Sequence, residues 1–172
     1  MKNLSALLLC LGLASCVSAQ ISEPSLCDTT SLGSIPASPV AGIVLPAHTF
    51  TDTFDFSQTI SKVTDVANQL TVGVTQLTVD GNDMSWVTGV TVSIEGSGNN
   101  TPEVVLATFT SNGTQDQSVP LTVTMDSNTL LSYLESGPIT LSVEVTGTAP
   151  LQPVTMTNTL CVMASGSFSK SL

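Results

Sequence analysis

Two pairs of aspartates stand out among the residues of this chain that could do chemistry. Asp52 and Asp55 are three positions apart, and Asp80 and Asp83 are the first and last residues of the sequence DGND. Two carboxyl groups across a cleft can hydrolyse a glycosidic bond, and clustered carboxylate and amide oxygens can bind Ca²⁺. Asp80, Asn82 and Asp83 are therefore calcium candidates, although the same three residues also suit a turn between strands.

Other catalytic chemistry lacks the residues that it needs. A nucleophile needs a base such as histidine, and the single histidine, His48, follows a proline-rich stretch where we expect a surface position. A zinc site needs three or four His, Cys or carboxylate ligands, and the chain has no Cys-x-x-Cys motif. We predict no catalytic residue and no cofactor. Trp86 follows DGND, and it is a candidate for stacking against a sugar ring.

The charge of the chain excludes two classes of partner. Among its 172 residues are 13 acidic ones against three lysines and no arginine, which gives a formal net charge of −10. Nucleic-acid binding needs Lys and Arg to neutralise phosphates, and attraction to an anionic membrane surface needs them as well. We predict that the protein binds no nucleic acid and that its acidity serves solubility.

The first 15 residues have the layout of an export signal. MKNLSALLLCLGLAS contains one lysine, then an apolar run, then small residues, which is the order found in secretory signal peptides. The apolar run is shorter than the roughly 20 residues that a membrane-spanning helix needs. We predict a signal peptide over residues 1–15, or over residues 1–19 if cleavage follows Ala19.

The end of this signal resembles the lipobox of bacterial lipoproteins. Leu13-Ala14-Ser15-Cys16 places an aliphatic residue and two small residues before a cysteine. The resemblance covers the signal alone, and it implies that Cys16 becomes an acylated N-terminus which anchors the protein in a membrane. Val17 in place of aspartate implies the outer membrane or the cell surface.

Cleavage at a second possible site would give a different mature protein. Val17-Ser18-Ala19 before Gln20 fits the small-x-small preference of ordinary signal peptidase, and the product would be a freely secreted protein. Asn99 and Asn112 would then be glycosylation candidates, because each begins an Asn-x-Thr sequon.

The cysteines predict one disulfide. Cys10 leaves with the signal and Cys16 carries lipid, so Cys27 and Cys161 remain for an exported protein in an oxidising compartment. Cys161 alternates with apolar Leu160 and Val162, so we expect it to face away from the core. The bridge would therefore hold the N-terminal segment across the outside of the domain.

Hydrophobic alternation predicts the fold. Residues 16–48 are rich in Pro and Ser, and we predict an irregular tether there with an edge strand near Gly42–Leu45. Residues 49–172 form the domain, in which apolar and polar residues alternate with the period of half-buried strands. We predict an all-β fold, an immunoglobulin-like antiparallel β-sandwich of about seven strands with one short connecting helix. The expected strands lie within 54–60, 69–79, 90–95, 103–109, 119–125, 139–145 and 154–164.

Two segments depart from simple alternation. The apolar phase of residues 69–79 shifts by one position near Gln76, which predicts a β-bulge. Asp126–Gly137 begins with a capping aspartate, continues with leucines at helical spacing and ends with glycine. These features predict the connecting helix, which would cover one end of the core.

The export signal and the shortage of catalytic residues together favour a non-catalytic role for the protein. We expect a lipid-anchored cell-surface protein with a structural, adhesive or assembly role. The alternative is a freely secreted protein, either a carbohydrate- or calcium-binding module or a hydrolase that uses carboxylates. The sequence identifies no particular protein or glycan as the partner.

Overall fold

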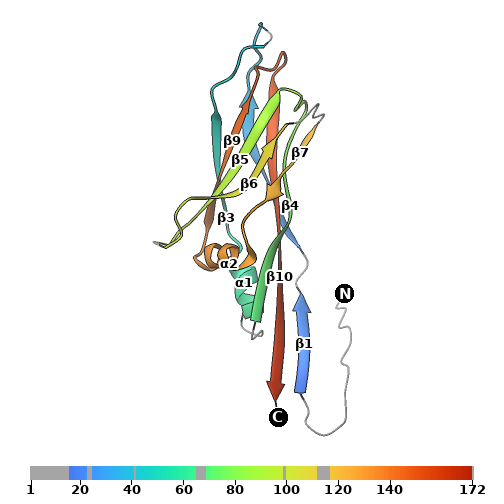
Figure 1. Cartoon of the computed structure of the whole chain (residues 1–172), viewed down its shortest axis with the longest axis vertical. Coiled ribbons are helices and arrows are strands. Elements are labelled where there is room, and N and C mark those ends of the chain that lie inside the picture. The colour runs from blue at the N-terminus through green and yellow to red at the C-terminus, as the bar shows by residue number, and fades with distance from the viewer. Residues whose placement is uncertain are drawn as a thin grey trace.

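The computed structural model describes residues 16–22, 25–40, 42–64, 69–98, 100–111 and 117–171. Within these residues the chain forms two antiparallel five-stranded sheets, and two short helices lie at one end of the pair (Figure 1). The predicted all-β, two-sheet antiparallel β-sandwich is confirmed. The predicted signal peptide, residues 1–15, lies outside the described residues.

The first sheet is built around the longest strand of the chain. Strand β10 has β1 and β2 on one side and β4 on the other, and β7 continues the sheet beyond β4. β1 pairs with the C-terminal half of β10, and β2 pairs with its N-terminal half. The bounds are β1 Cys16–Ser22, β2 Leu26–Ile35, β4 Gln69–Gly81, β7 Ser118–Pro120 and β10 Val154–Ser171.

The second sheet has the order β3-β9-β5-β6-β8. Strand β9 alternates strictly between buried and less buried residues, and β5 does so from Val90 to Glu95, as their sequences predict. The chain passes from one sheet to the other at most of its connections. The bounds are β3 His48–Phe54, β5 Val87–Gly96, β6 Val104–Thr110, β8 Thr122–Val123 and β9 Ile139–Gly147.

The predicted short helix is present as α2, Ser127–Glu135, and it joins β8 to β9 within the second sheet. Asp126 caps it, since its carboxylate accepts hydrogen bonds from the backbone N–H groups of Asn128 and Thr129. Gly137 follows with a φ of 112°, a conformation that glycine adopts without strain. The helix buries Leu130, Tyr133 and Leu134 against the core.

A second helix, α1 (Ser57–Thr64), replaces the second half of an expected strand. Strand β3 stops at Phe54, and the Asp55 carboxylate accepts the N–H of Ser57 at the start of the helix (2.9 Å). Phe56 and Ile60 are both buried. Their spacing of four fits one face of a helix as well as one face of a strand, so alternation alone assigned the wrong element.

The prediction of an irregular tether over residues 16–48 is wrong for the two strands β1 and β2. Only Leu32 and Ile35 of β2 are buried, so the sequence has little apolar alternation to reveal the strand. Both segments are strands because their backbones pair with β10. At the expected edge strand near Gly42–Leu45 the structure has a single bridge, between Val44 and Thr148.

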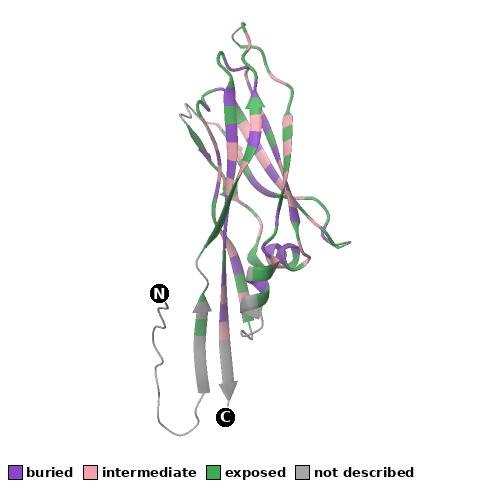
Figure 2. Cartoon of the chain, turned by 180° about the vertical axis from the view of Figure 1, so that it is seen from behind, coloured by how far each residue is buried: buried purple, intermediate pink, exposed green. Residues whose placement is uncertain are grey.

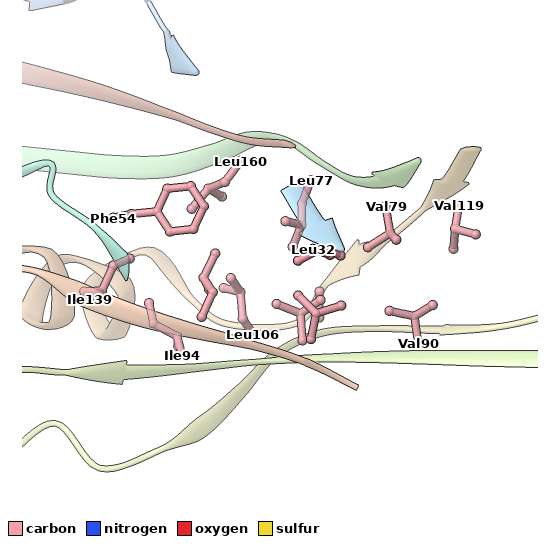
Figure 3. Packing of buried hydrophobic residues seen from close by; sticks show 14 of the residues in the cluster. Leu32, Phe54, Leu77, Val79, Val90, Ile94, Leu106, Val119, Ile139 and Leu160 are labelled. Carbon is pink, nitrogen blue, oxygen red and sulfur yellow. The ribbon is translucent and has the colours of Figure 1, made fainter. Parts of the chain in front are cut away.

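The core lies between the two sheets. Figure 3 shows Phe54, Leu77, Val79, Leu106 and Leu160 pointing into the space between the layers. The predicted bulge is present, because the register with β10 skips one residue of β4 between its two halves. The skipped residue is Thr75, which lets Val72 and Leu77 share the buried face despite their odd spacing.

Asn158 interrupts the apolar face of β10. It is 0% exposed, and neither its amide nitrogen nor its amide oxygen has a hydrogen-bond partner among the described residues. Its register partner on β2, Thr30, has an unpartnered hydroxyl as well. Burying such groups without partners is costly.

We therefore expect Asn158→Val to raise the free energy of unfolding by about 1–2 kcal/mol, because it removes two unsatisfied polar atoms. Urea denaturation measures the change. Asn158→Asp is the control, and it should be strongly destabilising because it buries a charge. A loss of stability in Asn158→Val would mean that the amide is hydrogen-bonded in solution.

Candidate functional site

One covalent bond joins the first and last parts of the described chain. Cys27 on β2 and Cys161 on β10 are direct register partners, and they form a disulfide with a Cα–Cα distance of 4.0 Å. The predicted bridge is therefore present in the structure. Cys161 is almost fully covered, yet it does not belong to the apolar core cluster, as its outward phase predicts. The bridge lies within one sheet, because the segment around Cys27 is a strand.

Cys16, the candidate lipidation residue, lies at one end of the molecule. It is the first residue of β1, and its register partner is Ser171, the last residue of β10. Figure 1 shows this pair of strands extending beyond the sandwich, with the C-terminus at the same end. Acylation of Cys16 stays a prediction.

The opposite end carries exposed apolar side chains. Two loops meet there: residues 36–47 between β2 and β3, and residues 148–153 between β9 and β10. Neither loop contains a charged residue. Figure 2 shows this end largely as exposed. We call its four exposed large apolar residues the apolar tip: Val40 (55% exposed), Ile43 (47%), Val44 (77%) and Leu151 (60%).

Backbone hydrogen bonds hold the two loops of the tip together. Ser38 N–H donates to the carbonyl of Pro150 (2.8 Å), and Ala149 N–H donates to the carbonyl of Ile43 (2.7 Å). Leu45 N–H donates to Gly147 in the adjoining strand (3.0 Å). These hydrogen bonds fix the backbone from which the apolar side chains project. Binding a partner at the tip would therefore cost little entropy for ordering the loops.

The three calcium candidates make hydrogen bonds within the protein in and beside the turn that follows β4. Asp80 accepts the hydroxyl of Thr78 (2.8 Å), and Asp83 accepts the N–H of Ser85 (2.9 Å). The hydrogen bonds from Ser85 lower the pKa of Asp83. Asn82 links the turn to the start of β10, since its side chain donates to Pro153 and accepts from Thr155. Among the described residues no three His, Cys, Asp or Glu side chains group as metal ligands.

Trp86 belongs to the core. The residue is 5% exposed, and its Nε1–H donates to the carbonyl of Asp83 (2.9 Å). The ring therefore has no open face against which a sugar could stack. The sequence could not distinguish this position from an exposed one, because Trp suits both.

Asp52, Asp55 and His48 make local contacts in β3 or directly after it. Asp52 accepts the N–H of Thr53 beside it (2.7 Å). Hydrogen bonds from Ser57 lower the pKa of Asp55, which serves the start of α1. His48 begins β3 and stacks near Phe50, with ring centroids 6.4 Å apart. Asn99 and Asn112, the glycosylation candidates, lie outside the described residues.

A shallow groove of about 280 Å³ lies beside β4, where β7 ends. Its lining contains no acidic or basic side chain. The groove therefore offers no pair of carboxylates for hydrolysis. The lining residues are Val74, Thr75, Gln76, Leu77, Thr78, Pro120, Leu121 and Val123.

The helices among the described residues are too short to cross a membrane. The larger of the two, α2, has nine residues.

Comparisons with known proteins give no family. No family model and no curated protein matches the chain. Among solved structures, Desmodium yellow mottle tymovirus is similar over 99% of this chain and 97% of that chain, with 11% identity and a TM-score of 0.28. The 60-mer BFDV capsid protein is similar over 89% and 94%, with 8% identity and a TM-score of 0.31.

Proposed function

We propose that this protein is exported, anchored in a membrane through lipid on Cys16, and has a non-catalytic structural, adhesive or assembly role at the cell surface. The observation that supports this most directly is the position of Cys16 as the first residue of a paired strand. Cleavage before Cys16 keeps all seven register pairs of β1, whereas cleavage after Ala19 removes the first four. The processed chain would then continue from its anchor directly into a sheet, with no flexible spacer.

The arrangement of the two ends also supports a surface role. The anchor residue and the apolar tip lie at opposite ends of the long axis, so an anchored molecule would hold its tip away from the membrane. Exposed apolar residues gathered at one end of an otherwise acidic protein favour a contact surface there. The apolar tip carries no charge, which favours an uncharged protein surface as its partner.

We infer a jelly roll as the class of sandwich, in place of the immunoglobulin-like class expected from the sequence. The order β2-β10-β4-β7 opposite β3-β9-β5-β6 supports it. This order arises when one long hairpin of strand pairs is wound into two sheets, so that the first strand lies beside the last. Folds of this kind have many functions, so the class leaves the choice of partner open.

Substitution of the anchor residue tests the proposal. Cys16→Ser should move the protein from the membrane fraction almost entirely into the soluble fraction, because two or more acyl chains are needed for stable anchoring. Intact-mass measurement of the native protein should find acyl groups on a chain that begins at Cys16. Cys10→Ser, within the signal, is the matched control and should stay with the membrane. A native chain that begins at Gln20 without acyl mass would disprove the anchor.

A further inference from the structure

Two extended segments connect the Cys16 end of the molecule with the apolar tip. The first consists of β1 and β2, and it leads into tip loop 36–47. The second is β10, which leaves tip loop 148–153 and ends beside Cys16. Figure 1 shows β10 along the length of the molecule with β1 beside its lower part. The Cys27–Cys161 disulfide joins the two segments between their ends.

The bridge creates a short covalent path from the Cys16 end to tip loop 148–153, whereas β1 and β2 reach tip loop 36–47 directly along the chain. The path runs from Cys16 along the chain to Cys27, crosses the disulfide to Cys161, and returns along β10 to Leu151 in the tip. Most of its residues are in strands, where the rise of about 3.3 Å per residue is close to the fully extended limit of about 3.6 Å. The path is therefore nearly taut in the folded protein.

The rest of the sandwich lies outside this path. The disulfide closes a loop of residues 28–160, and residues 28–150 of that loop lie outside the path. A pull on the two ends is therefore not transmitted through the backbone of β3–β9. The hydrogen bonds between β10 and its neighbours run across the strand direction. A pull along the strands therefore loads these bonds together and does not open them one at a time.

We propose that this path, β1 through the Cys27–Cys161 bridge to the upper half of β10, carries tension between the anchor and the tip and spares the sandwich from it. This inference rests on the proposed function, because tension arises only if the chain is held near Cys16 and contacts a partner at its tip. The disulfide is then a mechanical element as well as a stabilising one.

Single-molecule stretching of the full exported protein tests the inference. Handles are attached through Gln20→p-azidophenylalanine on β1 and Leu151→p-azidophenylalanine in the tip, two exposed positions. With the bridge intact, we expect less than about 20 Å of extension beyond the folded length, because the path between the handles is already extended. Reductant added to the same molecule under load should release roughly 400 Å, the length of the remaining chain at about 3.4 Å per residue.

A second handle position is the matched control. In the control the handles are at Gln20 and at Glu135→p-azidophenylalanine on α2. The covalent path between them runs through the bridge, back along β10 and then along β9, so it is much longer than the direct distance between the handles. Part of β10 and all of β9 must then peel from their neighbours, and we expect a release on the order of 80 Å with the bridge intact. Equal release from the two handle pairs would overturn the inference.

Two other results would also overturn it. One is a release of more than about 100 Å between Gln20 and Leu151 before reduction. The other is no further release after reduction at the same load. Because Gln20 is present after either cleavage, these measurements stay interpretable even if Cys16 proves not to be acylated, so the two proposals fail separately.

Discussion

Replacing both Cys27 and Cys161 by serine should lower the free energy of unfolding by about 3–5 kcal/mol. The bridge joins residues 134 positions apart. Without it the unfolded chain regains the conformational entropy that closing so long a loop removes, so the unfolded state becomes more favourable. It also locks β2 to β10, a contact between distant parts of the sequence that is slow to form. Urea denaturation of the double variant, in a Cys16→Ser background, measures the loss.

A neighbouring pair on the same two strands provides the control. The hydroxyls of Thr29 and Thr159 lie 3.0 Å apart across β2 and β10, two register positions from the bridge. Thr29→Ala with Thr159→Ala should cost less than about 1 kcal/mol, because it removes only one cross-strand contact. Reductant should destabilise the native protein as much as the double serine substitution does. A loss below about 1 kcal/mol in the serine variant would contradict the entropic account.

Gly147→Ala should cost about 3 kcal/mol, a large effect for one added methyl group. Gly147 ends β9, and a Cβ there would collide with the backbone carbonyl of Trp86. That carbonyl accepts the N–H of Thr148 (2.9 Å), so separating the two strands breaks a hydrogen bond as well. Trp86 is the single tryptophan of the chain, and its fluorescence should shift to longer wavelength as the indole becomes exposed. Urea denaturation followed by this fluorescence measures both changes.

Gly73→Ala is the matched control for this substitution. Gly73 is also in a strand, β4, but no atom lies within 4 Å of the position that its Cβ would take. We expect a change within about 0.5 kcal/mol and an unchanged fluorescence maximum. Equal urea midpoints for the two alanine variants would show that Gly147 has room for a side chain.

The elements predicted correctly are those whose signals are local or repeated. β9 buries one complete face, and β5 buries Val90, Val92 and Ile94 at alternate positions, so alternation was sufficient to predict both strands. α2 has its cap at Asp126 and its terminating Gly137 in the sequence itself. The bulge at Thr75 appeared as a shift in phase because Val72 and Leu77 must face the same core.

The errors have equally specific causes. β2 exposes most of its side chains, so nothing in its pattern distinguished it from a loop. Phe56 and Ile60 satisfy both helical and strand spacing, and α1 was therefore missed. The exposed Val44 and Leu151 of the apolar tip have the same residue types as the core, so composition could not indicate that they face solvent. Their signal was the lack of any charge in the two proline-rich loops.

The sequence by itself determined the composition of the faces, the acidic charge and the pair of cysteines available for a bridge, and it carries the predicted export signal. These properties depend on residue type and on spacing over a few positions. Only the tertiary structure decided that the first and last strands are neighbours, that Trp86 is buried, and that Cys16 and the apolar tip lie at opposite ends. These properties depend on which distant segments pair through backbone hydrogen bonds, and such bonds are nearly the same for every sequence.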